Sequence, residues 1–222
     1  VGKVVGGTFG AIEAIMEEVM VTARKKSSTE AVQDVPVAVS AFSGEQLEAV
    51  FVRDLQSLSF AMPNVSLEDI GTVAGTANFS IRGLGVNSSI PSIDPTVGVF
   101  VDGMYLGINA GVVFDVFDLE GIEVLRGPQG LLFGRNVTGG AVLLKTRKPS
   151  DEFTANFKVG LEEGLEKLVA GSVSGPLIDG KLSGRITAYY KNDDGWYNNL
   201  FDGNKDFGKE ETVLFRPSMT FT

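Results

Sequence analysis

The sequence predicts an α+β domain, a small mixed sheet with short helices, followed by a series of antiparallel β-strands. Two observations support this prediction. Between residues 31 and 150, short apolar segments alternate with glycine-rich turns and one amphipathic segment of helical period. Between residues 151 and 222, apolar and polar residues alternate along extended segments, which is the period of strands with two different faces. Residues 1–30 form a leader that ends in a polar linker, RKKSSTE.

Composition narrows the possible functions. The chain of 222 residues contains no cysteine and no histidine, which excludes disulfides, thiolate metal sites and imidazole catalysis. Its net charge of −9 argues against a nucleic-acid partner, which requires a basic face. Asp94 and Asp102 lie in no oxygen-rich loop of calcium-binding spacing, so we predict no metal and no cofactor.

The first region combines strands with a single helix. VPVAVSAF (35–42) predicts a strand, and SGEQLEAVFVRDLQSLSF (43–60) predicts a helix with Ser43 as N-cap and Gln46 as its capping-box partner. Further strands are predicted at 78–85, 96–106, 122–127 and 141–147. The apolar residues of the helix share one face: Leu47, Val50, Phe51, Leu55 and Leu58.

In the last region, apolar and polar residues alternate along three segments that we predict to be strands, 153–161, 184–191 and 213–222. A weaker strand is predicted at 166–176. A soluble antiparallel sheet with one buried face produces the same alternation. A tight turn at 176–181 and a long polar loop at 192–211 instead favour a membrane barrel, which has short turns at one end and long loops at the other.

The stretch LRGPQGLLFGRNVTGG (125–140) holds five glycines, which suit a phosphate cradle, a catalytic elbow or structural turns. A Walker loop requires lysine and a hydroxyl residue after its last glycine, but Arg135 and Asn136 follow Gly134. The stretch has no G-x-G spacing and no serine for a nucleophile elbow. We therefore predict structural turns, formed by Gly127, Pro128, Gly130, Gly134, Gly139 and Gly140.

Several motifs occur together in a fixed order: EEVMVTA (17–23), QDVPVAVSAFSGEQLE (33–48), SIRGLG (80–85), VGVFVDGMYLG (97–107), DLEGIEVLRGPQGLLFGRNVTGGAV (118–142) and TRKP (146–149). With these motifs the chain resembles a TonB-dependent outer-membrane receptor of the siderophore-receptor type. The resemblance runs from about residue 17 to the C-terminus. It assigns residues 17–23 to the TonB box, 31–150 to the plug domain and 151–222 to the first strands of a transmembrane β-barrel.

The resemblance implies a barrel of about 22 strands that encloses the plug. Residues 151–222 supply about four strands, which cannot close, so we expect an N-terminal fragment of a longer receptor. Such a receptor lies in the outer membrane of a Gram-negative bacterium and contacts its lipid. It binds an iron–siderophore or a similar large scarce nutrient and imports it to the periplasm with energy from TonB.

The same resemblance implies the site residues. The TonB box would pair as an added strand with the TonB C-terminal domain. Arg82 and Arg126 match plug arginines that pair with glutamates of the barrel wall. The loops 85–95 and 105–111 match the apices that contact the substrate. The TonB-box residues are Glu18, Val19, Met20, Val21, Thr22 and Ala23, and the apex candidates are Asn87, Ser88, Ser89, Tyr105 and Asn109.

Two other classes compete with a receptor. A soluble α/β enzyme would use Arg126 or Arg135 with Asp102 or Glu123 near the glycines, but histidine, cysteine and a serine elbow are all missing. We therefore predict no enzymatic activity. A plug-like module that binds ligand without transport is the alternative, and the need for detergent distinguishes it from a barrel fragment.

Overall fold

The computed structural model describes residues 20–21, 30–31, 37–49, 52, 54–69, 76–86, 93–107, 116–161, 166–195, 200–201 and 209–221. The chain divides into two compact units, Val1–Thr146 and Arg147–Thr222, and each is described by itself. Among the described residues, no helix has the length and apolar character needed to cross a lipid bilayer.

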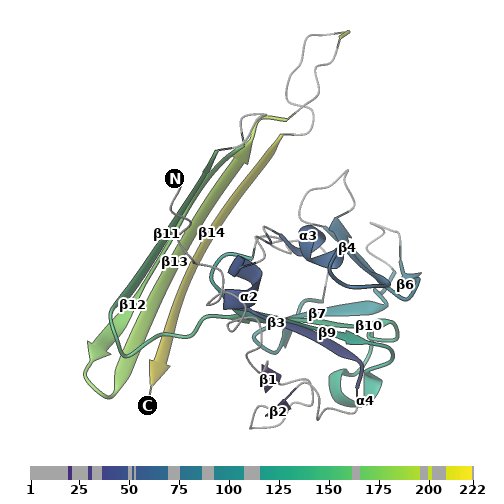
Figure 1. Ribbon diagram of the computed structural model, residues 1–222, viewed down its shortest axis with the longest axis horizontal. Coiled ribbons are helices and arrows are strands. Elements are labelled where there is room, and N and C mark those ends of the chain that lie inside the picture. The colour runs from purple at the N-terminus through teal and green to yellow at the C-terminus, as the bar shows by residue number, and fades with distance from the viewer. Residues whose placement is uncertain are drawn as a thin grey trace, which may run out of the picture. The chain divides into compact units, whose positions relative to one another are not determined.

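The first unit is built on a five-stranded mixed sheet in the order β3-β9-β10-β7-β8 (Figure 1). β10 pairs in antiparallel with β9 and in parallel with β7, so the mixed sheet predicted from the sequence is confirmed. The strands are β3 (Val39–Ser43), β9 (Leu119–Arg126), β10 (Gly140–Thr146), β7 (Val97–Val101) and β8 (Met104–Tyr105).

Two smaller sheets accompany it. A three-stranded antiparallel sheet comprises β4 (Val65–Asp69), β5 (Ala77–Ile81) and β6 (Leu84–Gly85), of which β4 was not predicted. Near the N-terminus, β1 (Met20–Val21) pairs in antiparallel with β2 (Glu30–Ala31).

The predicted single helix over 43–60 is wrong, because the segment forms α2 (Gly44–Ala49) and α3 (Leu55–Ser59). The predicted capping box is present: the Ser43 N–H donates to Gln46 Oε1 and the Gln46 N–H donates to Ser43 Oγ, each at a distance of 3.2 Å. Asp54 separates the helices because its backbone is extended and its carboxylate accepts the Ser57 N–H at 2.6 Å, which begins a new helix.

The predicted strands at 78–85 and 96–106 are each a hairpin. Arg82 and Gly83 turn between β5 and β6 with φ of 55° and 78°, and Asp102 and Gly103 turn between β7 and β8 with φ of 49° and 82°. Two positive φ angles in succession define the turn whose twist suits a two-residue hairpin.

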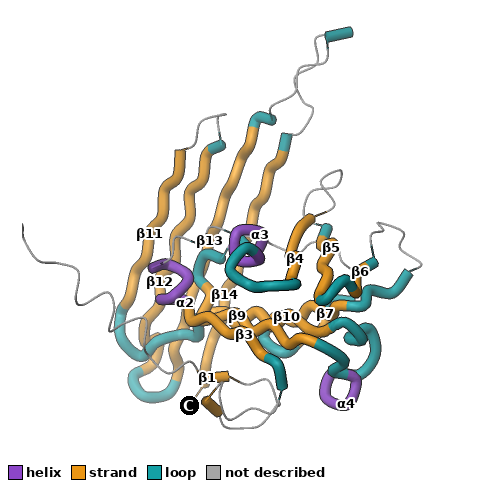
Figure 2. Tube along the Cα trace, turned by 45° about the vertical axis from the view of Figure 1, so that its right-hand side comes forward, coloured by secondary structure: helices purple, strands orange, loops and turns teal. Residues whose placement is uncertain are grey.

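Apolar side chains pack on both faces of the five-stranded sheet. Along β9 and β10, alternate residues belong to two different clusters, because successive side chains of a strand point to opposite faces. One cluster includes Ile122 and Val142 and is covered by α2, α3, β4 and β5. The other includes Leu125 and Leu143 and is covered in part by the segment around α4 (Gly130–Phe133), as Figure 2 shows. The predicted helical face contributes Leu47, Leu55 and Leu58 to the first cluster, while Val50 and Phe51 lie outside the described residues.

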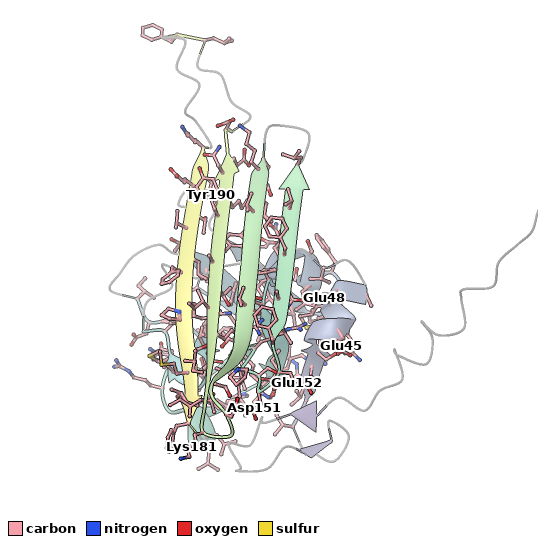
Figure 3. All side chains as sticks on the ribbon, turned by 90° about the vertical axis from the view of Figure 1, so that its left-hand side faces the viewer. Glu45, Glu48, Asp151, Glu152, Lys181 and Tyr190 are labelled. Atoms are coloured by element: carbon pink, nitrogen blue, oxygen red, sulfur yellow. The ribbon has the colours of Figure 1, made fainter. Side chains whose placement is uncertain are left out.

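The second unit is a four-stranded antiparallel sheet in chain order (Figures 2 and 3). Its strands are β11 (Thr154–Leu161), β12 (Lys167–Ile178), β13 (Leu182–Asp193) and β14 (Glu210–Phe221). The tight turn predicted within 176–181 joins β12 and β13, where the Lys181 N–H donates to the Ile178 carbonyl at 3.0 Å. Figure 3 places Lys181 at this end of the sheet and Tyr190 toward the other.

The second sheet exposes apolar side chains and buries polar ones, which is the reverse of a soluble protein. Its exposed side chains are mainly apolar, and Phe157 and Phe215 are 73% and 67% exposed. The alternate positions hold buried polar side chains: Ser172, Ser174, Ser183, Arg185 and Thr187. Some bond to one another, as Arg185 Nη2 donates to Ser172 Oγ at 2.9 Å. An apolar outer face with a polar inner face is the pattern of barrel strands in lipid, and it is the opposite of a soluble sheet that buries its apolar face.

Candidate functional site

Arg126 ends β9 with its guanidinium partly buried. Its Nη2 donates to Ser40 Oγ on β3 at 2.8 Å, and its backbone N–H donates to the Ala38 carbonyl at 2.9 Å. Its Nε is buried and has no hydrogen-bond partner among the described residues. A buried guanidinium nitrogen without an acceptor is costly, so Arg126 keeps one unmade hydrogen bond within the described part of the chain.

Arg82 approaches the same place from another sheet. It is exposed at the β5–β6 hairpin, and its Nη1 lies 3.6 Å from where a Cβ on Gly127 would stand. The two predicted arginines are therefore brought to one turn. A proline at position 128 favours an extended backbone at Gly127. Its φ is +97°, which glycine alone adopts easily, so the chain already bends at Gly127.

The glycine-rich stretch packs closely against neighbouring backbone. The sequence predicted only turns here, but Gly130–Phe133 forms the one-turn helix α4, followed by Gly134 at φ +79°. A Cβ on Gly139 would lie 3.1 Å from the Leu84 carbonyl oxygen. A Cβ on Gly140 would lie only 2.3 Å from the Leu125 carbonyl oxygen. These glycines make room for neighbouring strands, and a bound phosphate is not needed to explain them.

A polar network lies beside α4 and centres on Asn136, which the sequence analysis missed. Its Nδ2 donates to Tyr105 Oη at 2.9 Å and to Asp94 Oδ1 at 3.1 Å. The Tyr105 ring packs against Phe100, whose ring also packs against Phe133, with centroid distances of 5.3 and 4.9 Å. A weak signal was available: asparagine among glycines favours positive φ, and Asn136 has φ of 65°.

Only part of the predicted TonB box and apices falls within the described residues. Met20 and Val21 form β1, whose backbone pairs with Ala31 and Glu30. Tyr105 is the one apex candidate that the structure describes. The other predicted residues lie outside the described part of the chain: Glu18, Val19, Thr22, Ala23, Asn87, Ser88, Ser89 and Asn109.

The acids considered for an enzyme make structural contacts. The Asp102 carboxylate accepts the Thr146 N–H and the Thr146 hydroxyl, each at 2.8 Å, which fixes the β7–β8 turn to the end of β10. Glu123 is buried in the sheet, and its Oε1 lies 2.5 Å from Lys145 Nζ. Both carboxylates are therefore engaged in holding the sheet together.

Comparison with known proteins assigns this arrangement to a family. A model of the TonB-dependent receptor plug domain matches residues 31–141. The pesticin receptor of Yersinia pestis is 29% identical over 189 residues, which cover 85% of this chain and 27% of that receptor. The ferrioxamine B receptor of Salmonella typhimurium is 28% identical over 193 residues, covering 85% of this chain and 25% of that receptor.

Solved structures agree. The ferric yersiniabactin uptake receptor of Yersinia pestis matches with a TM-score of 0.70 at 26% identity, over 82% of this chain and 28% of that receptor. The ferripyoverdine receptor of Pseudomonas aeruginosa matches with a TM-score of 0.72 over 92% of this chain and 25% of that receptor; at 17% identity this likeness shows the fold alone. The chain spans about a quarter of the length of these relatives.

The mixed sheet, the short helices and the matched family together define the plug of an outer-membrane receptor. The chain belongs to the TonB-dependent receptor plug domain family, as its motifs predicted. The predicted fold class is confirmed. The predicted location, the outer membrane of a Gram-negative bacterium, agrees with the family and the matching receptors. The matching proteins are receptors and transporters.

Proposed function

We propose that this chain is the N-terminal part of a receptor that binds a ferric siderophore and imports it with energy from TonB. Residues 1–30 would be the leader with the TonB box, 31–150 the plug and 151–222 the first barrel strands. The single observation that carries this proposal is the apolar outer face of β11–β14 in a chain that also holds a plug domain. The names of the matching receptors support a ferric siderophore as substrate.

The proposal includes two partners. TonB would add a strand to the backbone around Met20 and Val21, where backbone hydrogen bonds matter more than side chains. Membrane lipid would cover the apolar face of the strands. A ligand-binding module without transport would need to keep this face away from water by other means, so the exposed face favours the receptor.

Uptake tests the proposal directly. Cells that lack their own siderophore receptors should gain uptake of radioactive iron from a ferric siderophore when they produce the complete receptor. Uptake should stop when TonB is removed, because binding alone moves no iron across the membrane. A protein that purifies as a soluble monomer without detergent, and supports binding but no uptake, would favour the ligand-binding module instead.

Phe157→Lys should reduce membrane insertion of the complete receptor. A cation near the middle of the lipid-facing surface costs about 2–4 kcal/mol. Asn156→Lys on the same strand is the matched control, because it places the same cation on the opposite face. The measurement is the amount of heat-resistant folded receptor in outer membranes, and equal losses for both variants would contradict a lipid-facing Phe157.

We propose that Arg126 pairs with a carboxylate of the barrel wall, as the family resemblance implies; its guanidinium is only partly buried where it bonds to Ser40. Arg126→Ala should destabilise the isolated chain by about 1 kcal/mol, because the bond to Ser40 is lost. In the complete receptor it should cost about 3–5 kcal/mol, because a wall carboxylate is left without its partner.

Hydrogen exchange of the β9 and β10 amides measures both effects. Ser40→Ala is the control, since it removes the bond within the plug and leaves the guanidinium in place. We expect Ser40→Ala to match Arg126→Ala in the isolated chain and to be milder in the complete receptor. Identical exchange for the two variants in both proteins would show that Arg126 acts only within the plug.

A further inference from the structure

Asn136 joins two segments that border the proposed substrate loops. Asp94 lies near the end of the predicted apex loop 85–95, and Tyr105 is the first residue of the predicted apex loop 105–111. The amide of Asn136 donates to both. We propose that Asn136 is a positioning residue that fixes these two loop borders, 93–96 and 104–107, relative to each other. This inference rests on the proposed function, because it assigns the borders to loops that contact the substrate.

The backbone that carries Asn136 is firmly held. The next residue, Val137, is 1% exposed, and its carbonyl accepts the Gln129 N–H at 3.0 Å. The Gly139 N–H donates to the Thr96 carbonyl at 2.8 Å. A Cβ on Gly98 would meet Val137 Cγ1 at 2.6 Å and the Asn136 carbonyl oxygen at 3.3 Å. The segment around Asn136 therefore rests directly on the start of β7, and its amide extends from a fixed base.

The chemistry of the side chain suits the bridging role. A primary amide has two N–H groups on one nitrogen, so it can donate to two acceptors at once. Aspartate has the same shape and also tolerates positive φ, but its carboxylate cannot donate and would repel Asp94. The Tyr105 hydroxyl can donate or accept, so it bonds to either residue. These differences allow each of the two contacts to be broken separately.

The test is residue-resolved hydrogen exchange on the 222-residue chain. Border 93–96 is followed at the Gly139 amide, which donates to the Thr96 carbonyl at 2.8 Å, and border 104–107 at the Leu106 amide, which donates to the Val99 carbonyl at 2.9 Å. Asn136→Asp should raise exchange about tenfold at the reporter of border 93–96 and leave that of border 104–107 near its original rate, since the Tyr105 hydroxyl can donate to the new carboxylate. Tyr105→Phe keeps the ring and should raise exchange in border 104–107 alone. Asn136→Gly keeps the positive φ at no cost and should loosen both borders.

The decisive variant exchanges the two partners. In the double variant Asp94→Asn, Asn136→Asp, the amide at 94 donates to the carboxylate at 136, so protection of border 93–96 should return. A purely local role of Asn136 in the backbone turn predicts no such rescue. Protection that stays lost in the double variant, or an Asn136→Gly chain that exchanges like the original, would overturn the proposal.

A second measurement concerns the substrate. In the complete receptor, with ferric yersiniabactin and ferrioxamine B as probes, Asn136→Asp should weaken binding at least several-fold and the double variant should restore it. Unchanged binding despite a loosened border would overturn the role toward substrate. A receptor that binds neither probe and supports no uptake counts against the proposed function, whereas the exchange experiment needs no substrate and still decides whether Asn136 couples the borders.

Discussion

Gly140→Ala should lower the free energy of unfolding of the plug in the isolated chain by about 3 kcal/mol. Gly140 has φ of +153°, and a Cβ there would stand 2.3 Å from the Leu125 carbonyl oxygen and 2.7 Å from Ile81 Cδ1. The Ile81 side chain can shift, but the carbonyl cannot, because Gly140 pairs with Arg126 in the β9–β10 ladder. Relief therefore requires the two central strands to separate.

Native-state hydrogen exchange of Val124 and Val142, at the centre of this ladder, measures the change. Gly130→Ala is the matched control: it lies in α4, where no atom stands within 4 Å of an added Cβ. It should be neutral or slightly stabilising, by up to about 1 kcal/mol, because alanine favours helix. Equal protection in the two variants would mean that β9 and β10 accommodate the methyl group.

Val21→Pro should abolish uptake by the complete receptor and leave surface binding of the ferric siderophore intact. Proline removes the backbone N–H and fixes φ, so the strand at Met20 and Val21 could no longer form the full set of hydrogen bonds that we propose with TonB. Val21→Ala keeps the N–H and should transport normally. Uptake of radioactive iron and binding at low temperature, measured on the same cells, separate the two steps.

The pairing of β1 with β2 requires a second control. Val21 lies opposite Glu30, so proline at position 21 also disturbs a contact within the chain. Glu30→Pro disturbs that contact and leaves the TonB-box backbone unchanged. We expect Glu30→Pro to retain uptake. If Glu30→Pro abolishes uptake as Val21→Pro does, the β1–β2 pair is the element that uptake requires. If Val21→Pro lowers binding and uptake equally, the TonB-box assignment fails.

The sequence was most informative where a pattern had one physical meaning. The capping box at Ser43 and the apolar spacing of Leu47, Leu55 and Leu58 predicted helix, and these leucines are buried. The break at Asp54 was missed, because aspartate also fits the polar face of one continuous helix. The Asp102-Gly103 turn could have been read from its dipeptide, which is typical of hairpins. Arg82 offered no such signal, since arginine rarely adopts positive φ.

The site was less accessible to local reasoning than the fold. Alternation predicted the strands of the second unit, but a period of two residues is the same whichever face is buried, so the exposure of Phe157 and Phe215 had to come from the structure. Arg82 and Arg126 came from the family resemblance. Asn136 was missed because its partners, Asp94 and Tyr105, are distant in sequence and become neighbours only when β7, β8 and α4 assemble.

The position of β3 at the edge of the five-stranded sheet has a mechanical consequence. Traction applied at β1 travels along the chain to β3 before any other strand of that sheet, and β3 is held by a single five-residue ladder to β9. β9 and β10 lie inside the sheet and are held on both sides, so they resist longer. Peeling β3 away withdraws Ser40 from the Arg126 guanidinium. A pull on the proposed TonB box would therefore act first on the contact between Ser40 and Arg126, and it would reach the centre of the plug last.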